Sequence, residues 1–279
     1  MVVYCERACN CAMVYTMIDA IQLAKTFKDF KAVKDVSFCA ADGEIFGLLG
    51  PNGAGKTTTL RMLSTVVQPS SGTATVDGYD IRSQRDAVRS RLGILVESAG
   101  LYAHSTTREH LRYIGNLHGL NGNGLEDRIQ TLIEKLGMLD FADRKASGFS
   151  RGMVRKVVMG MSLIHDPPNI ILDEPTQGLD VVSTRAVRDI IRQFKEDGRC
   201  VVLSTHHMDE VERLCDRVAI VHRGEILEKG TPAELIEKYQ VADLETAFVE
   251  IVGADALLAE AEREAEQDKK KKRRRKRRQ

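Results

Sequence analysis

The chain has 279 residues, of which 43% are hydrophobic and 29% charged, an ordinary globular composition with room for one large domain or two small ones. It has no run of about eighteen apolar residues, so we expect no membrane-spanning helix, and Glu6, Arg7 and Asn10 interrupt any N-terminal secretory signal. Six scattered cysteines do not suggest a disulfide framework, which favours a reduced, cytosolic protein.

The formal charge of +1 is the sum of two oppositely charged parts. Ten of the 41 Lys and Arg residues form an unbroken run at 269–278, which leaves 31 basic residues against 40 acidic ones, or −9, elsewhere. A block of like charges does not fold. It is a solvated tail, an anchor for anionic lipid, or an attractor of nucleic acid, and the last is the least favoured.

Residues 1–17 lack regular apolar periodicity and are expected to form a disordered leader. Cys5, Cys9 and Cys11 lie in this segment, but their spacing lacks a second ligand pair, so we favour a leader over a metal site. From Ile18 to Phe38 the apolar residues indicate short strands around a turn. The folded body therefore begins near residue 18.

A glycine-rich loop follows the next strand. Ile45–Leu49 is a short apolar run, as expected of a strand buried on both faces. After the loop, 58–67 has helical spacing and ends before Pro69. Leu92–Val96 is another candidate for a buried strand. These segments predict a strand, loop and helix in direct succession.

The remaining segments alternate between strands and helices. Apolar runs predict strands at 169–172, 200–204 and 218–221, and helical patterns occupy about 151–165, 181–197 and 208–215. Such alternation predicts an α/β fold with a largely parallel sheet. Residues 98–149 interrupt it and are expected to form an inserted helical subdomain, with a loop at Asn121-Gly122-Asn123-Gly124.

The end of the body is marked by turn signals. Arg223-Gly224 predicts a hairpin turn, and Pro232 opens a last small helix. The body is expected to end near residue 252. The segment 253–279 then forms a tail, in which Ala254–Gln267 is an Ala/Glu-rich helix former and 269–278 is the basic run.

The glycine-rich segment fits the phosphate-loop pattern G-x-x-x-x-G-K-[ST]. Its glycines allow a tight turn that aims backbone N–H groups at phosphates, and the following helix adds its N-terminal dipole. Lys56 supplies a positive charge, and the Thr57 hydroxyl can ligate Mg²⁺. The predicted nucleotide-binding residues here are Gly50, Pro51, Asn52, Gly53, Ala54, Gly55, Lys56, Thr57 and Thr58.

Two carboxylates end the predicted strand at 169–172, where parallel sheets bind ligands. We expect Asp173 to hold hydrated Mg²⁺ and Glu174 to polarise the attacking water, because phosphoryl transfer depends mainly on positioning and charge neutralisation. A helix cap is the alternative, and the preceding phosphate loop favours the functional interpretation.

With these motifs the chain resembles an ATP-binding cassette (ABC) ATPase over residues 18–252. Phe149-Ser150-Arg151-Gly152-Met153 resembles the family signature, and the resemblance implies that Ser150 and Gly152 face the γ-phosphate held by a second copy. Asp180 in Gly178-Leu179-Asp180 resembles the D-loop of the dimer seam. His206 resembles the switch histidine that contacts γ-phosphate.

Each of these residues has a simpler interpretation. Phe27 resembles the aromatic residue that stacks on adenine, but Phe30 lies close enough to compete, and Phe27 could belong to the core. His206 could be a surface histidine, although His207 is the better candidate for that. Ser150 could be only a helix cap. Their order and spacing together favour the family.

The resemblance implies a P-loop NTPase fold with a RecA-like, mainly parallel core, a small antiparallel β subdomain and the inserted helical subdomain. It implies an ATPase, with ATP and Mg²⁺ as cofactors and Lys56, Glu174 and His206 as catalytic residues. The partners would be a second copy and an integral-membrane permease, with the chain peripheral on the inner face of the cell membrane. The alternative is a non-transport ABC ATPase acting on nucleic acid or ribosomes.

Two departures from the family pattern stand out. Glu97 occupies the position where the family usually has a Gln that contacts Mg²⁺; a carboxylate can still ligate the ion but adds negative charge. Arg151 and Met153 alter the signature. Together with 44–50 and 63–67, these residues look like those of two-component efflux systems for sodium ions or drugs.

Overall fold

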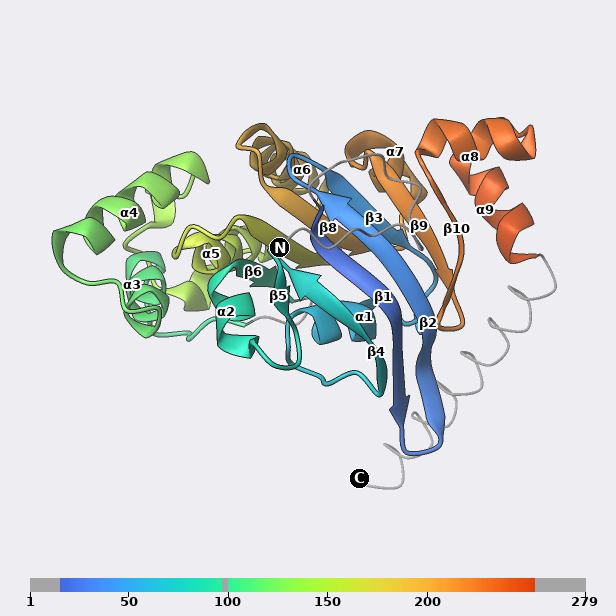
Figure 1. Ribbon diagram of the computed structural model, residues 1–279. Coiled ribbons are helices and arrows are strands. Elements are labelled where there is room, and N and C mark those ends of the chain that lie inside the picture. Colours follow the sequence, from blue (N-terminus) through green and yellow to red (C-terminus); the bar gives the residue numbers. More distant parts are fainter. Residues whose placement is uncertain (1–15, 97–99, 254–279) are drawn as a thin grey trace, which may run out of the picture.

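The computed structural model describes residues 16–96 and 100–253. Its single sheet has ten strands in the order β5-β4-β1-β2-β10-β9-β3-β8-β7-β6 (Figure 1). The strands are β1 Thr16–Phe27, β2 Phe30–Ala41, β3 Ile45–Leu49, β4 Ser71–Val76, β5 Tyr79–Asp80, β6 Leu92–Leu95, β7 Asn169–Asp173, β8 Cys200–Thr205, β9 Arg217–His222 and β10 Glu225–Gly230.

The sheet has an antiparallel part and a mainly parallel part. Strands β1, β2, β4 and β5 pair antiparallel, whereas β9, β3, β8, β7 and β6 form consecutive parallel pairs. Strand β10 joins the two parts, because it pairs antiparallel with β9 and parallel with β2. The predicted α/β fold, with a parallel core and a small antiparallel β subdomain, is confirmed.

Helices cover both faces of this sheet (Figure 1). They are α1 Lys56–Leu63, α2 Arg85–Ser90, α3 Thr107–Leu117, α4 Gly122–Lys135, α5 Arg151–Leu163, α6 Val181–Glu196, α7 Met208–Leu214, α8 Pro232–Tyr239 and α9 Leu244–Val252, with 3-10 turns at Leu139–Phe141 and Ala146–Gly148. No helix within 16–96 and 100–253 has the length and apolar character needed to cross a membrane.

Strand β3 lies at the centre of the packing. All five of its residues are buried. Ile45 and Leu49 join the core formed with α3–α9, whereas Phe46 and Leu48 join the core formed with α1, α2 and the antiparallel strands. Successive side chains of a strand point to opposite faces, so a continuous apolar run is what a doubly covered central strand requires.

The inserted segment packs α3 and α4 against α5, away from the antiparallel strands (Figure 1). The expected loop at 121–124 is wrong in detail, because α4 begins at Gly122 after Asn121. Gly122 has a φ of +62° and sits in the first turn, where N–H groups lack intrahelical partners, so glycine costs little there.

Other boundaries also differ from expectation. Thr16 and Met17 belong to β1, and the rest of the expected leader lies outside the described residues. The sequence pattern does not predict β4, β5 or α2. The hairpin turn is confirmed, since Arg223 and Gly224 link β9 to β10 with φ of 48° and 82°. The tail, with its helix former and basic run, also lies outside the described residues.

Candidate active site

The loop after β3 approaches its neighbours too closely for side chains at two positions. A Cβ on Gly50 would lie 2.1 Å from the carbonyl oxygen of Val221. At Gly55, φ is +107° and a Cβ would lie 2.8 Å from the carbonyl oxygen of Ala32. Gly55 is also the N-cap of α1. Glycine is therefore required where the loop meets a helix N-terminus, whose free N–H groups favour anions.

Lys56 is the first residue of α1 and its side chain is only 5% exposed. Its Nζ donates hydrogen bonds to the carbonyl oxygens of Gly50 at 2.6 Å and Pro51 at 3.2 Å. It also lies 3.5 Å from Oε1 of Glu174. A buried ammonium is thus fixed between the loop and the carboxylate of Glu174, which directly follows β7.

Oxygen atoms of Thr57, Asp173 and Ser204 lie close together after the loop. The Thr57 hydroxyl donates to Oδ1 of Asp173 at 3.1 Å, and the Ser204 hydroxyl donates to the same oxygen at 2.5 Å. Asp173 is the last residue of β7 and is buried. A hydroxyl and a carboxylate side by side are the hard oxygen ligands that Mg²⁺ binds, so these residues fit that ion.

Glu174 is held in a strained backbone conformation. Its φ is +48°, the left-handed region that is uncommon for residues other than glycine. Its N–H donates to the carbonyl oxygen of Ser204 at 3.1 Å and to the Ser204 hydroxyl at 3.3 Å. The strain and the two bonds direct the Glu174 carboxylate back towards Lys56.

His206 follows β8 and also contacts the Glu174 carboxylate. Its Nδ1 lies 3.0 Å from both carboxylate oxygens of Glu174. An ionised carboxylate only accepts hydrogen bonds, so Nδ1 carries the proton in this pair. His207 is the exposed neighbour and is the N-cap residue of α7. The structure thus brings Lys56, Glu174 and His206 together.

A cavity of about 190 Å³ opens beside these groups. It is lined by Phe30, Ala32, Pro51, Asn52, Gly53, Ala54, Gly55, Lys56, Thr57, Thr58, Glu174 and Gln177. The predicted loop residues from Pro51 to Thr58 all line it. Gly50 does not, although its carbonyl oxygen holds Lys56.

The aromatic residue beside the cavity is Phe30. Phe27 is outside the lining, and the Lys25 ammonium lies 5.0 Å from the centre of its ring. Both aromatic residues flank the turn of the β1–β2 hairpin, where Phe27 pairs with Phe30. Gln177 and Ala32 also line the cavity, and neither carries a motif that marks it in the sequence.

Ser150, Gly152 and Asp180 form a second group, outside this cavity. Ser150 caps α5 and accepts from the N–H of Met153 at 3.2 Å. A Cβ on Gly152 would lie 2.5 Å from the Ser183 hydroxyl oxygen, and that hydroxyl donates to Asp180 at 2.8 Å. Hydrogen bonds from Ser183 lower the pKa of Asp180 below its ordinary value. Within one chain the predicted site residues therefore form two separate groups.

Arg151 connects the start of α5 to the segment before α6. Its Nη1 donates to the carbonyl oxygen of Gly178 at 3.3 Å. Arg151, one of the residues that alter the signature, is therefore hydrogen-bonded to the Gly178-Leu179-Asp180 segment. Glu97, the remaining candidate metal ligand, lies outside the described residues.

Comparisons with known proteins agree with this geometry. A family model described as ABC transporter matches residues 33–177. The ABC transporter ATP-binding protein NatA of Bacillus subtilis (strain 168) is 42% identical over 238 residues, which cover 84% of this chain and 97% of NatA. The linearmycin resistance ATP-binding protein LnrL of the same strain is 37% identical over 222 residues, covering 80% of this chain and 71% of LnrL.

A solved structure titled as that of the ATP-binding subunit of an ABC transporter superposes with a TM-score of 0.77 at 29% identity. The match covers 85% of this chain and all of the other chain. The similarity in sequence and the similarity in structure thus lead to the same family of ATP-binding proteins.

Proposed function

The chain belongs to the ABC transporter family of ATP-binding proteins, and we propose that it is the ATP-hydrolysing subunit of an exporter for sodium ions or drugs. The observation that carries this proposal is the contact of Glu174 with both Lys56 and His206 beside the phosphate loop. Hydrolysis of ATP requires a positively charged group next to the phosphates and a carboxylate facing the attacking water. This arrangement supplies both.

In the proposed reaction, the loop N–H groups and Lys56 bind the β- and γ-phosphates. Glu174 polarises a water molecule that attacks the γ-phosphorus, and the bond from that phosphorus to the β–γ bridging oxygen breaks. The Nδ1–H of His206 holds the Glu174 carboxylate in place. Charge neutralisation and alignment provide most of the acceleration in reactions of this class.

Thr57 and Asp173 would hold Mg²⁺, which neutralises phosphate charge when bound. Ser204 supports this role, because its hydroxyl fixes one oxygen of Asp173. We propose Glu97 as a further carboxylate ligand in place of the usual Gln. Mg²⁺ dependence that is identical in the wild type and Glu97→Gln would contradict that role.

We propose that the active form is a homodimer in which each ATP lies between two copies. The separation of Ser150, Gly152 and Asp180 from the cavity in a single chain supports this, because these residues would complete the site of the second copy. Val181 and Val182 follow Asp180 and are largely exposed, as expected of residues that a second copy would cover.

A membrane permease would dock on the helical subdomain, on the inner face of the cell membrane. Exposed Tyr102, Tyr113 and Leu117 support this assignment. Tyr102 and Tyr113 meet edge to face with ring centres 6.3 Å apart, and such amphipathic aromatics are enriched at interfaces. The basic run 269–278, outside the described residues, is proposed to contact anionic lipid near the same membrane.

The cargo is proposed from the sequence resemblance to sodium and drug efflux ATPases. The name of LnrL, a linearmycin resistance protein, supports a drug. No nucleic-acid enzyme is among the relatives described above, so the alternative of an ABC ATPase acting on nucleic acid or ribosomes is not favoured.

The test compares the purified wild type with Glu174→Gln. The wild type should release inorganic phosphate from MgATP and the variant should not; equal rates would contradict the proposal. Sodium and drug efflux from cells that produce either chain together with its copurifying membrane protein then tests direction and cargo.

A further inference from the structure

Glu210, on α7, is a fully buried carboxylate with no part in the reaction proposed above. Its Oε1 accepts a hydrogen bond from the Thr176 hydroxyl at 2.5 Å, and its Oε2 accepts one from the Thr205 hydroxyl at 2.8 Å. Burying an ionised carboxylate is strongly unfavourable unless it is paired and hydrogen-bonded, so a hydrogen bond to each of its oxygens fixes the position of the Glu210 carboxylate.

The two threonines flank the two residues that face each other in the site. Thr176 is two residues after Glu174, and Thr205 immediately precedes His206. The Thr205 hydroxyl oxygen also accepts from the N–H of His207 at 3.1 Å. One carboxylate therefore ties the segment that carries Glu174 to the segment that carries His206.

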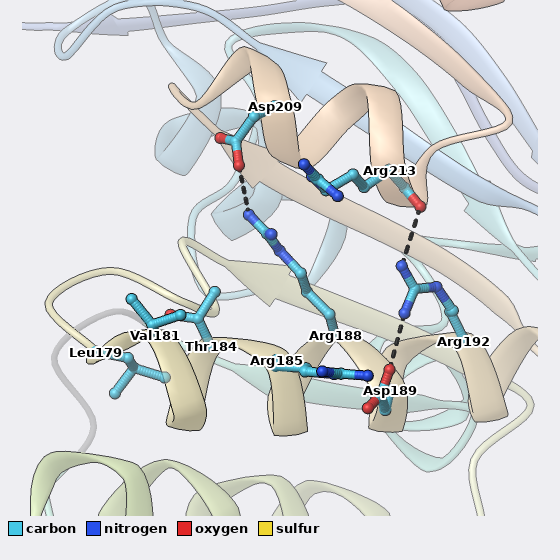
Figure 2. A pocket seen from close by; sticks show the side chains of 9 residues that line it. All are labelled: Leu179, Val181, Thr184, Arg185, Arg188, Asp189, Arg192, Asp209 and Arg213. Atoms are coloured by element: carbon cyan, nitrogen blue, oxygen red, sulfur yellow. Dashed lines mark hydrogen bonds and ion pairs between the residues drawn. The ribbon is translucent and has the colours of Figure 1, made fainter.

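The third partner of Glu210 comes from α6. Arg188 Nε lies 3.7 Å from Glu210 Oε1, and Arg188 Nη2 donates to Asp209 at 2.8 Å. Figure 2 shows the Arg188 side chain reaching from α6 to Asp209, across a groove of about 640 Å³ between α6 and α7. Because α6 begins directly after Asp180, Arg188 connects Glu210 to the segment proposed to meet a second copy.

We propose that Glu210 is a positioning residue that sets the distance between Glu174 and His206 and, through Arg188, links that distance to α6. The inference rests on the proposed roles of Glu174 and His206. A purely structural role would make Glu210 matter for folding alone. A positioning role makes it matter for the rate of hydrolysis in a protein that still folds and binds ATP.

The experiment measures kcat and KM for ATP together with the melting temperature. Glu210→Gln keeps the side-chain shape but removes the charge, and Thr176→Val replaces the hydroxyl with a methyl group of similar size. Each should lower kcat at least about tenfold with KM within about twofold of wild type, because a small misplacement of catalytic groups costs rate more than binding. Thr176→Ser, which keeps the hydroxyl, should restore kcat.

Glu212→Gln is the matched control, since it makes the same chemical change on α7 where the carboxylate instead accepts from the N–H of Leu244 at 3.1 Å. It should leave kcat unchanged. Wild-type kcat in both Glu210→Gln and Thr176→Val would overturn the inference, as would a rise in KM that accounts for the whole loss. If Glu210→Gln fails to fold, Thr176→Val against Thr176→Ser decides alone. A wild type without ATPase activity would overturn the proposed function first, and the inference with it.

Discussion

The Nδ1 of His206 lies 3.0 Å from both carboxylate oxygens of Glu174, although the two residues follow different strands, β8 and β7. The register of β7 and β8 brings them together, because Asp173 pairs with Ser204 and Glu174 and His206 follow these partners. The contact places a carboxylate with a fixed orientation beside Lys56. It is the geometric centre of the proposed chemistry.

Thr57 provides a test of the proposed Mg²⁺ site. Its hydroxyl is 3.1 Å from Asp173, so Thr57→Val removes a ligand and keeps the shape, whereas Thr57→Ser keeps the hydroxyl. We expect Thr57→Val to lower ATPase activity about a hundredfold at physiological Mg²⁺ and Thr57→Ser to stay near wild type. Activity measured across a Mg²⁺ titration checks this. Equal Mg²⁺ curves for the two variants would remove Thr57 from the metal site.

Ser150 can be tested for its role beyond capping α5. Ser150→Asp preserves the cap, because Asp and Ser are comparable N-caps, while Ser150→Ala should cost about 1 kcal/mol of stability. Ser150→Asp should nevertheless abolish ATP-driven dimerisation, since its charge would oppose the γ-phosphate of the second copy. Melting temperature and size-exclusion chromatography with ATP separate these effects. A dimer of normal affinity in Ser150→Asp would leave Ser150 as a cap only.

A stacked histidine pair predicts how stability depends on pH. The rings of His118 and His165 lie 3.8 Å apart, and burial, together with the neighbouring His118, lowers the pKa of His165 to about 4. Below the ordinary histidine pKa of about 6.5 the unfolded chain takes up a proton that the folded chain excludes. The contribution of His165 to the free energy of unfolding is therefore present above pH 6.5 and is lost as the pH falls towards 4.

Urea unfolding between pH 7 and pH 5 measures this contribution. The free energy of unfolding should fall less steeply with decreasing pH in His165→Gln than in the wild type. His104→Gln, a change at an exposed histidine, serves as the control and should follow the wild type. If His165→Gln also follows the wild type, His165 is not the source of the dependence.

The proposed docking surface predicts a loss of coupling. Tyr102 is 69% exposed, and its N–H donates to Nε2 of the buried His110 at 2.9 Å, so its backbone is fixed while most of its side chain is exposed to a partner. Replacing Tyr102 and Tyr113 by Ala should reduce export about tenfold, the loss typical of interface anchors, and leave basal ATPase activity unchanged. Leu139→Ala, at an exposed residue of the same subdomain, is the control. Normal export in the double variant would place the permease elsewhere.

The nucleotide-binding loop could be predicted because the residues that form it are consecutive in the sequence. Gly50–Thr57 and the Asp173-Glu174 pair each follow an apolar run, and the sheet then places both at the same edge. Local pattern was enough for these residues, and for the α/β fold itself.

Other features depend on tertiary contacts that no local pattern records. The hairpin at Phe27 and Phe30 places only the second ring beside the cavity, and the register shift between Lys25 and Thr26 in the same hairpin is not visible in the sequence. The hydrogen bond between Thr176 and Glu210, for example, joins residues that are 34 positions apart in the sequence. The weakly apolar strand β4 was missed because its pattern is small and polar.

In the proposed cycle two copies close on ATP, and Glu174 then drives hydrolysis. Size-exclusion chromatography with light scattering on Glu174→Gln separates these two steps, because the change keeps the side-chain shape and removes the charge that polarises water. We expect a monomer without nucleotide and a stable dimer with bound, unhydrolysed ATP. A Glu174→Gln chain that stays monomeric in ATP, or that still hydrolyses it at the wild-type rate, would rule out this cycle.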